Sequence, residues 1–130
     1  MSPSGHTYLR THLISGPLMG FDLKAEDLRL RDAAATARSR RASKTLVKEG
    51  SLRIVLVAAA KDGALARHSA ESSVSIHVLR GSWILATPDG NAAIRSGELI
   101  VLGAGLVHGL TATTDASILI TISTGERPAA

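Results

Sequence analysis

The chain has 130 residues with 45% hydrophobic and 20% charged side chains, which fits one folded domain and excludes a largely disordered chain. The absence of cysteine excludes disulfides, thiolate zinc sites, iron–sulfur clusters and a cysteine nucleophile, and three aromatic residues are too few for a stacking platform for bases or sugars. The net charge of +4 is concentrated in residues 24–48, which hold eight of the fifteen basic residues and three of the eleven acidic ones.

Residues 1–21 are expected to form an arm that is irregular or contains at most a short edge strand. They show no hydrophobic periodicity and carry several turn-forming residues, among them Gly16, Pro17 and Gly20. No run of about 18 apolar residues occurs in the chain, so neither a membrane span nor a signal-peptide core is predicted. The sequence therefore predicts a soluble cytoplasmic protein.

A helix of about three to four turns is expected to begin after Asp22. Asp22 is suited to cap the helix N-terminus, and Glu26 and Asp27 fall in the first turn, where the helix dipole favours negative charge. A rough apolar stripe supports the helix and consists of Leu23, Leu28, Leu30, Ala34 and Ala37. The Arg- and Ser-rich stretch from Arg38 to Lys48 is interpreted as a solvated connector, so that residues 22–48 form a helix and a basic connector.

The basic connector also raises the question of nucleic-acid binding. Its cations include Arg38, Arg40, Arg41, Lys44 and Lys48. Acidic residues are interspersed in the preceding helix, and neither a recognition helix nor a zinc-finger pattern follows. A solvated face explains this composition as well, so nucleic acid is not expected as a partner.

After residue 50 the sequence pattern changes to short strands separated by turns. Strands are expected at residues 52–59, 74–80, 82–87, 92–95, 98–102 and 117–123, with a turn at Pro88, Asp89, Gly90 and Asn91. No helix-length segment separates them, which favours an antiparallel sandwich or small barrel over a parallel α/β fold. Residues 49–124 are therefore assigned to a mainly β domain, and residues 125–130 to a C-terminal tail.

The segment from Gly103 to His108 is a partial match to a dinucleotide-binding fingerprint, because it is glycine-rich and follows a predicted strand. A pyrophosphate site also needs a helix after the loop, but residues 109–115 are Thr-rich and turn-like. We therefore interpret the glycines as a tight turn between antiparallel strands.

Two glycine- and histidine-containing segments of the region from about Lys44 to Ser123 resemble the two motifs of the cupin superfamily. In the second motif Gly97, Gly105 and His108 are in register, whereas Gly103 replaces the proline and Ala112 the asparagine. In the first motif His68 and Gly81 are in register, and Gly63 is one residue too close to His68. The resemblance implies a cupin-type antiparallel β-barrel, of the jelly-roll or double-stranded β-helix type, after an N-terminal helix. Gly81, Gly97 and Gly105 also suit tight turns on their own, because glycine tolerates a positive φ.

Metal-binding cupins hold iron, manganese, zinc or nickel with three histidines and one glutamate, and this resemblance implies His68 and His108 as ligands. The other two motif positions are Ala70 and Val74, so half of the ligand set is missing. Glu71 and His77 are the nearest candidates for a third ligand. Strand alternation places His77 on the face opposite to Val74, Ile76 and Val78, which leaves Glu71.

The remaining interpretation of His68 and His108 is a small-molecule pocket inside an apolar barrel, with Ser69, Glu71 and Thr111 on its rim. A purely structural role, with the imidazoles hydrogen-bonded to each other, to water or to the backbone, is the alternative. The predicted function is a small-molecule binding or regulatory module; the other candidate is a divalent-metal-dependent enzyme of the oxygenase or isomerase type. A homodimer is expected through the outer sheet face that carries Ser75, His77 and Leu79.

Overall fold

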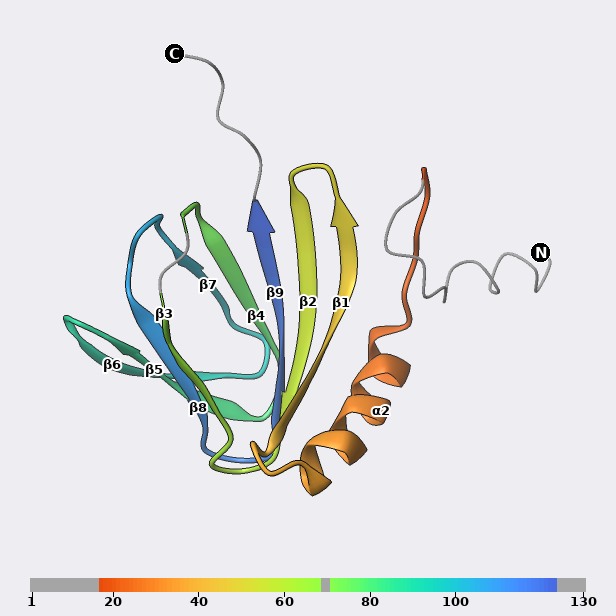
Figure 1. Cartoon of the computed structure of the whole chain (residues 1–130). Helices are drawn as coiled ribbons and strands as arrows, with labels where there is room; N and C mark the ends of the chain where they lie inside the picture. Colours follow the sequence, from red (N-terminus) through yellow and green to blue (C-terminus); the bar gives the residue numbers. More distant parts are fainter. Residues whose placement is uncertain (1–16, 69–70, 124–130) are drawn as a thin grey trace, which may run out of the picture.

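The computed structural model describes residues 17–68 and 71–123, which form one helix and nine strands (Figure 1). The helix is α2 (Leu23–Thr36). The strands are β1 (Arg41–Glu49), β2 (Leu52–Ala59), β3 (Ala64–His68), β4 (Val74–Arg80), β5 (Ser82–Thr87), β6 (Gly90–Arg95), β7 (Leu99–Leu102), β8 (His108–Ala112) and β9 (Ala116–Ser123). The N-terminal arm before Pro17, Ser69 and the tail after Ser123 lie outside the described residues.

The strands form two antiparallel sheets that face each other. The five-stranded sheet has the order β1-β2-β9-β4-β7, and the four-stranded sheet has the order β3-β8-β5-β6. Several neighbouring strands come from distant parts of the chain; for example, β9 lies between β2 and β4. The predicted mainly β, antiparallel fold is therefore confirmed, in the form of a two-sheet sandwich.

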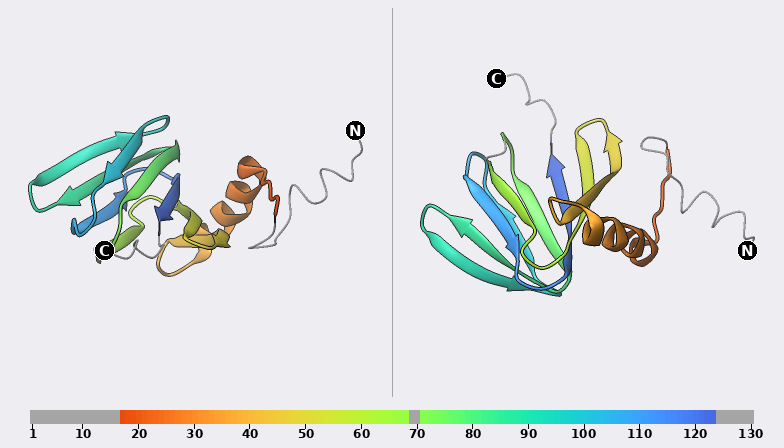
Figure 2. Two further views of the ribbon diagram at one scale, coloured as in Figure 1. Left: turned by 90° about the horizontal axis from the view of Figure 1, so that it is seen from above. Right: turned by 60° about the horizontal axis from the view of Figure 1, so that its bottom comes forward.

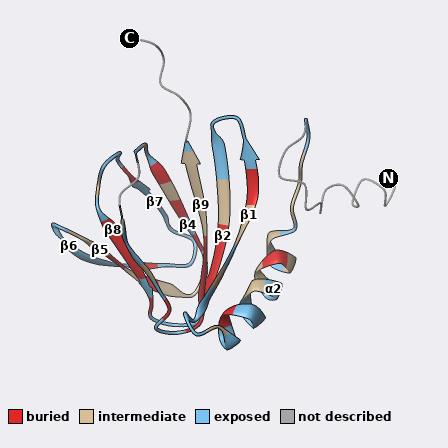
Figure 3. Cartoon of the chain, in the orientation of Figure 1, coloured by how far each residue is buried: buried red, intermediate tan, exposed pale blue. Residues whose placement is uncertain are grey.

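The main core lies between the two sheets and is built from aliphatic side chains around one tryptophan. Val74, Ile76 and Val78 of β4 are buried there, as alternation along that strand predicted, whereas His77 is exposed. Trp83 has 0% exposure and is the largest fully buried side chain. Figure 3 shows buried residues on the strands of both sheets and exposed residues along β6 and at the β1–β2 hairpin. The apolar alternation of β4 therefore shows which face of that strand points into the core.

Helix α2 covers the outer face of the five-stranded sheet over β1 and β2 (Figure 2). Asp22 caps it as predicted, because its carboxylate accepts a hydrogen bond from the backbone N–H of Ala25 at 3.1 Å. The predicted apolar stripe is wrong at Leu28, which is 52% exposed. The contact surface instead forms a second apolar cluster that joins the helix and the segment before it to the sheet: Leu46, Val47 and Leu56, with Met19, Phe21, Leu23, Leu30, Ile54, Leu79 and Leu119 packed against them.

Ion pairs attach the helix to the sheet. Glu26 is only 2% exposed, and its carboxylate accepts a hydrogen bond from Nζ of Lys44 at 2.9 Å. The next residue, Asp27, faces β4 and β9, where Nε of Arg80 and Oγ of Ser117 both donate to its carboxylate at 2.9 Å. The two acidic residues expected to favour the helix N-terminus therefore also anchor the helix to the sheet.

The interpretation of residues 38–48 as a solvated connector is wrong. Arg41–Glu49 forms edge strand β1, which pairs with β2 along its length and buries Leu46 and Val47. Its polar composition follows from its place at the sheet edge, where much of the strand stays exposed. Residues 109–115 are likewise not only turn: His108–Ala112 forms β8, and this strand after the glycine loop confirms that a dinucleotide-binding helix is absent there.

Gly81, between β4 and β5, shows why glycine is required at the predicted turns. Its φ is +73°, and a Cβ at this position would overlap the carbonyl oxygen of Asp115. Gly97 and Gly105 also adopt positive φ, as expected for tight turns. No helix in the described part of the chain is long and apolar enough to cross a bilayer.

Candidate ligand-binding site

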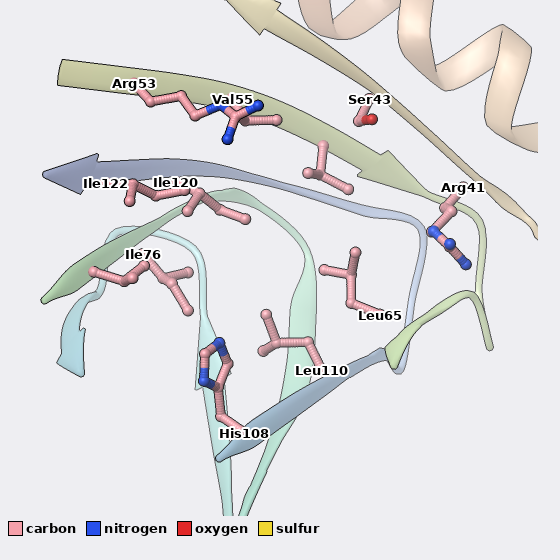
Figure 4. A pocket seen from close by; sticks show the side chains of 12 residues that line it. Arg41, Ser43, Arg53, Val55, Leu65, Ile76, His108, Leu110, Ile120 and Ile122 are labelled. Atoms are coloured by element: carbon pink, nitrogen blue, oxygen red, sulfur yellow. The ribbon is translucent and has the colours of Figure 1, made fainter. Parts of the chain in front are cut away.

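A cavity of about 400 Å³ lies between the two sheets. Most of its wall is aliphatic, and its polar groups come from three strands (Figure 4). The residues that line it are Arg41, Ser43, Arg53, Val55, Val57, Leu65, Val74, Ile76, His108, Leu110, Ile120 and Ile122. An apolar wall with a few placed polar groups is the usual construction of a small-molecule site.

His108 is the buried polar group of this cavity. It is the first residue of β8, is 4% exposed, and shares the inner face of that strand with Leu110. Its Nδ1 lies 3.0 Å from the carbonyl oxygen of Leu106. Because a carbonyl oxygen only accepts, Nδ1 carries the proton in this contact, and the ring orientation is fixed by the turn before β8.

The backbone of His68 lies directly opposite His108. The two residues are register partners at the ends of β3 and β8. A bulge between Leu65 and His68 creates this pairing, because two residues of β3 stand opposite the single residue Gly109 of β8. The side chain of His68 lies outside the described part of the structure, so the meeting of the two imidazoles remains a prediction.

The other predicted rim residues are not brought to the cavity. Thr111 is exposed and alternates with His108 and Leu110, so it belongs to the outer face of the four-stranded sheet; its assignment to the pocket is wrong. Glu71 is exposed in the connection between β3 and β4 and is not part of the cavity wall. Ser69 lies outside the described residues.

Sequence reasoning missed Arg41, Ser43 and Arg53. Arg41 and Ser43 were assigned to the solvated connector, although alternation in a strand would have placed both on one face. Arg53 shares the inner face of β2 with Val55 and Val57, and this alternation was visible in the sequence. Arginine side chains near a strand end are usually interpreted as solvated, and for this reason the alternation at Arg53 was not used.

The described residues do not provide a divalent-metal site of the kind that the resemblance implies. No group of three or more His, Asp or Glu side chains lies together among the described side chains, which are those of residues 17–67 and 71–123. Moreover, the cavity wall contains two arginines and no carboxylate. Sites for iron, zinc or nickel usually have at least three protein ligands, so one described imidazole beside two guanidinium groups does not make such a site.

No protein-family model and no curated protein matches the sequence. Solved structures do match the fold. The conserved protein SPY1581 of unknown function from Streptococcus pyogenes aligns with a TM-score of 0.70 and 21% identity over 90% of this chain and 95% of that one. A cupin superfamily protein from Desulfitobacterium hafniense aligns with a TM-score of 0.65 and 13% identity over 72% and 86% of the two chains. An RmlC-like cupin from Desulfovibrio desulfuricans aligns with a TM-score of 0.64 and 24% identity over 88% and 100%.

The chain has the cupin fold. Its two-sheet order, together with the glycine turns at Gly81, Gly97 and Gly105, agrees with the resemblance seen in the sequence. The cupin fold also occurs in proteins as different as the polyketide cyclase RemF from Streptomyces resistomycificus and the cupin domain of Cnp3 from Schizosaccharomyces pombe, both at a TM-score of 0.60. The fold alone therefore does not select a function, and the cavity must be interpreted from its own residues.

Proposed function

We propose that this cupin domain is a small-molecule binding or regulatory module whose ligand occupies the cavity between the two sheets. The observation that carries the proposal is the cavity itself, with a volume of about 400 Å³, aliphatic walls and a buried histidine. This volume falls within the range of roughly 300–1,000 Å³ that small-molecule sites usually have.

The walls and the polar groups of the cavity have separate roles in this proposal. Val55, Ile76 and Ile120 lie side by side across three adjacent strands and offer a continuous apolar surface to the body of a ligand. His108 has a fixed ring orientation and supplies a directional contact. Apolar area would therefore provide most of the affinity, and the imidazole would provide orientation.

The metal-dependent enzyme is the weaker candidate. It retains the paired positions His68 and His108, but the cavity wall adds two guanidinium groups where an acidic ligand would be needed. Because the described donor set does not fit a divalent cation, no catalytic step through a metal is derived.

The binding function is tested by filling the cavity. Ile120→Trp places a bulky indole ring between Val55 and Ile76, whereas Leu28→Trp makes a similar change at a position of α2 that is 52% exposed. A library of small organic molecules is screened against the natural chain and both variants by ligand-observed NMR. At least one compound is expected to bind saturably to the natural chain and to Leu28→Trp, but not to Ile120→Trp.

Circular dichroism and the melting temperature establish whether Ile120→Trp is folded, and Val55→Phe replaces it if it is not. Compounds that bind all folded variants equally well would place binding elsewhere. This outcome, or a library without a single saturable ligand, would contradict the proposed function.

We also propose that the chain forms a homodimer through the part of the five-stranded sheet that α2 leaves uncovered. On edge strand β7, Leu99 is 63% exposed and Val101 is 66% exposed. Their register partners on β4 are His77 and Ser75, so the patch has no formal charge when His77 is neutral. Two copies of a chain with a net charge of +4 can therefore meet at this face without bringing like charges together.

A further inference from the structure

We propose that the ligand of this cavity carries a carboxylate that pairs with Arg53, attached to an aliphatic body that lies along the isoleucines of β9 and β4 in the same sheet. This inference rests on the proposed binding function and specifies the chemical class of the ligand. It depends on three features of the described residues: the charge of the cavity wall, the missing acidic partners, and the position of Arg53 relative to His108.

The charged groups of the cavity wall are all cationic. Arg41 and Arg53 are the two charged residues among the twelve that line the cavity, and none of the twelve is acidic. Lys48 adds to this charge, because it is the register partner of Arg53 on β1, and directly opposite residues of an antiparallel pair project to the same face. A like-charge pair in this arrangement is unfavourable by itself, and an anion between the strands would relieve it.

Two partly buried cations outside the cavity, Lys44 and Arg80, have acidic partners. Glu26 pairs with Lys44 and Arg29, and Asp27 pairs with Arg80. Neither arginine of the cavity has an ion pair within residues 17–68 and 71–123. Nη1 of Arg41 donates to the carbonyl oxygen of Ala64 at 2.9 Å and so links the edges of the two sheets. Arg53 is exposed at the rim of the cavity and has no such contact with a described residue, so its fork of donors is available to a carboxylate.

Arg53 lies at the same end of the cavity as His108, on the opposite sheet (Figure 4). Arg53 is the register partner of Ile122, which in turn pairs with Val74 at the start of β4. Strand β3 ends at His68, only a short connection before β4 begins at Val74. His108, at the start of β8, is the register partner of His68 and therefore lies at this end of the cavity as well. A ligand can therefore receive a charged contact from one sheet and an imidazole contact from the other.

Arg41 cannot join Arg53 in holding the same carboxylate. It lies opposite Ala59, six residues from Arg53 along β2, which corresponds to roughly 20 Å of strand. Between the two arginines the wall is aliphatic, with Val55 and Val57 on β2 and Ile120 on β9. This arrangement fits one carboxylate at the Arg53 end and an apolar chain that extends along the wall.

Hexanoate and hexanamide are suitable probes, because they share one chain and differ in charge. Binding is followed by amide chemical shifts in ¹⁵N NMR spectra at low salt. Hexanoate is expected to bind about threefold to fivefold more tightly than hexanamide, since a charge-assisted, bidentate contact is stronger than a neutral one even at an exposed arginine. It is also expected to bind roughly tenfold more tightly than butyrate, because two further methylene groups are buried.

Arg53→Gln is the test variant, and Arg67→Gln is the control with the same change in net charge. Arg67 lies on the outer face of β3, where its Cγ is 3.2 Å from the place that a Cβ on Gly109 would occupy. The hexanoate preference is expected to fall below about twofold in Arg53→Gln, to survive in part in Arg53→Lys, and to remain in Arg67→Gln.

The carboxylate assignment is overturned if hexanamide binds as tightly as hexanoate, if Arg53→Gln keeps the preference, or if hexanoate does not bind up to its solubility limit. Neutral library compounds that bind the natural chain but not Ile120→Trp would, in those cases, leave the binding function intact. If no compound of any charge binds in the cavity, both proposals fail.

Discussion

Asp27 is expected to be one of the strongest stabilising residues of the outer face, although it lies on a helix surface. Its carboxylate accepts hydrogen bonds from Nε of Arg80 at 2.9 Å, from Nη2 of Arg80 at 3.2 Å, and from Oγ of Ser117 at 2.9 Å. The Asp27 and Arg80 side chains are 14% and 23% exposed, and Ser117 is fully buried. Asp27→Ala removes all three acceptor contacts in one step and leaves the donors in place.

The loss of stability in Asp27→Ala follows from the two donors that lose their acceptor, the Ser117 hydroxyl and the Arg80 guanidinium group. A buried hydroxyl that loses its acceptor costs about 1–3 kcal/mol, and a half-buried guanidinium that loses its carboxylate adds about 1 kcal/mol, because solvent reaches it and the carbonyl oxygen of Ala116 lies within 3.4 Å. The free energy of unfolding should therefore fall by about 2–4 kcal/mol. For a domain of this size the melting temperature should fall by roughly 8–15 °C.

Urea unfolding measures this change directly. Trp83 is the single tryptophan and has 0% exposure, so its fluorescence reports the global transition. Asp32→Ala is the matched control, because Asp32 is exposed on the same helix, and it should change the free energy of unfolding by less than about 0.5 kcal/mol.

A second variant separates the loss of the ion pair from the cost of leaving hydrogen-bond donors without an acceptor. In Asp27→Leu combined with Arg80→Met and Ser117→Ala, no polar group is left without a partner, so the triple variant should be more stable than Asp27→Ala alone. The reasoning is refuted if Asp27→Ala costs no more than the Asp32→Ala control, or if the triple variant is less stable than the single one.

Three further predictions concern the turns, the metal and the assembly. Gly81→Ala should lower the free energy of unfolding by at least about 2 kcal/mol, because both the positive φ and the Asp115 carbonyl oxygen oppose a Cβ. Gly97 also has a positive φ but has open space around it, so Gly97→Ala should lower the free energy of unfolding by only about 1 kcal/mol. Equal losses in urea unfolding would contradict the role of the close contact at Gly81. Elemental analysis of tag-free protein should find no stoichiometric divalent metal. If the natural chain contains such a metal and the His68→Ala/His108→Ala variant does not, the metal-dependent enzyme is favoured instead. Val101→Glu should convert a homodimer to a monomer in light scattering, and an unchanged mass would rule out the proposed face.

Local sequence patterns predicted the elements that depend only on residues close together in the chain, such as alternating apolar residues, a helix cap or a turn glycine. The ends of β2, β4 and β5 agree with the expected ranges, since β-branched alternation and turn residues mark them. The cap at Asp22 and the positive φ of Gly81 also follow from local chemistry, which does not depend on what lies beyond the next few residues. The core face of β4 was predictable for the same reason.

The tertiary structure decided the features that depend on pairing between distant segments. Strand β1 has the composition of a connector, and it is a strand because β2 pairs with it and because Glu26 of α2 neutralises Lys44. Glu26 is buried for the same reason, although helix periodicity alone would leave it in solvent.

The candidate site shows the same division. The sequence by itself determined that position 108 carries an inward-facing imidazole, because the motif and its glycine turn are local. Strand register decided three other features of the site: the bulge that places position 68 opposite position 108, the outward direction of Thr111, and the position of Arg53 in the cavity wall. A shift of one residue in register reverses the face of every side chain, and only long-range packing selects among registers.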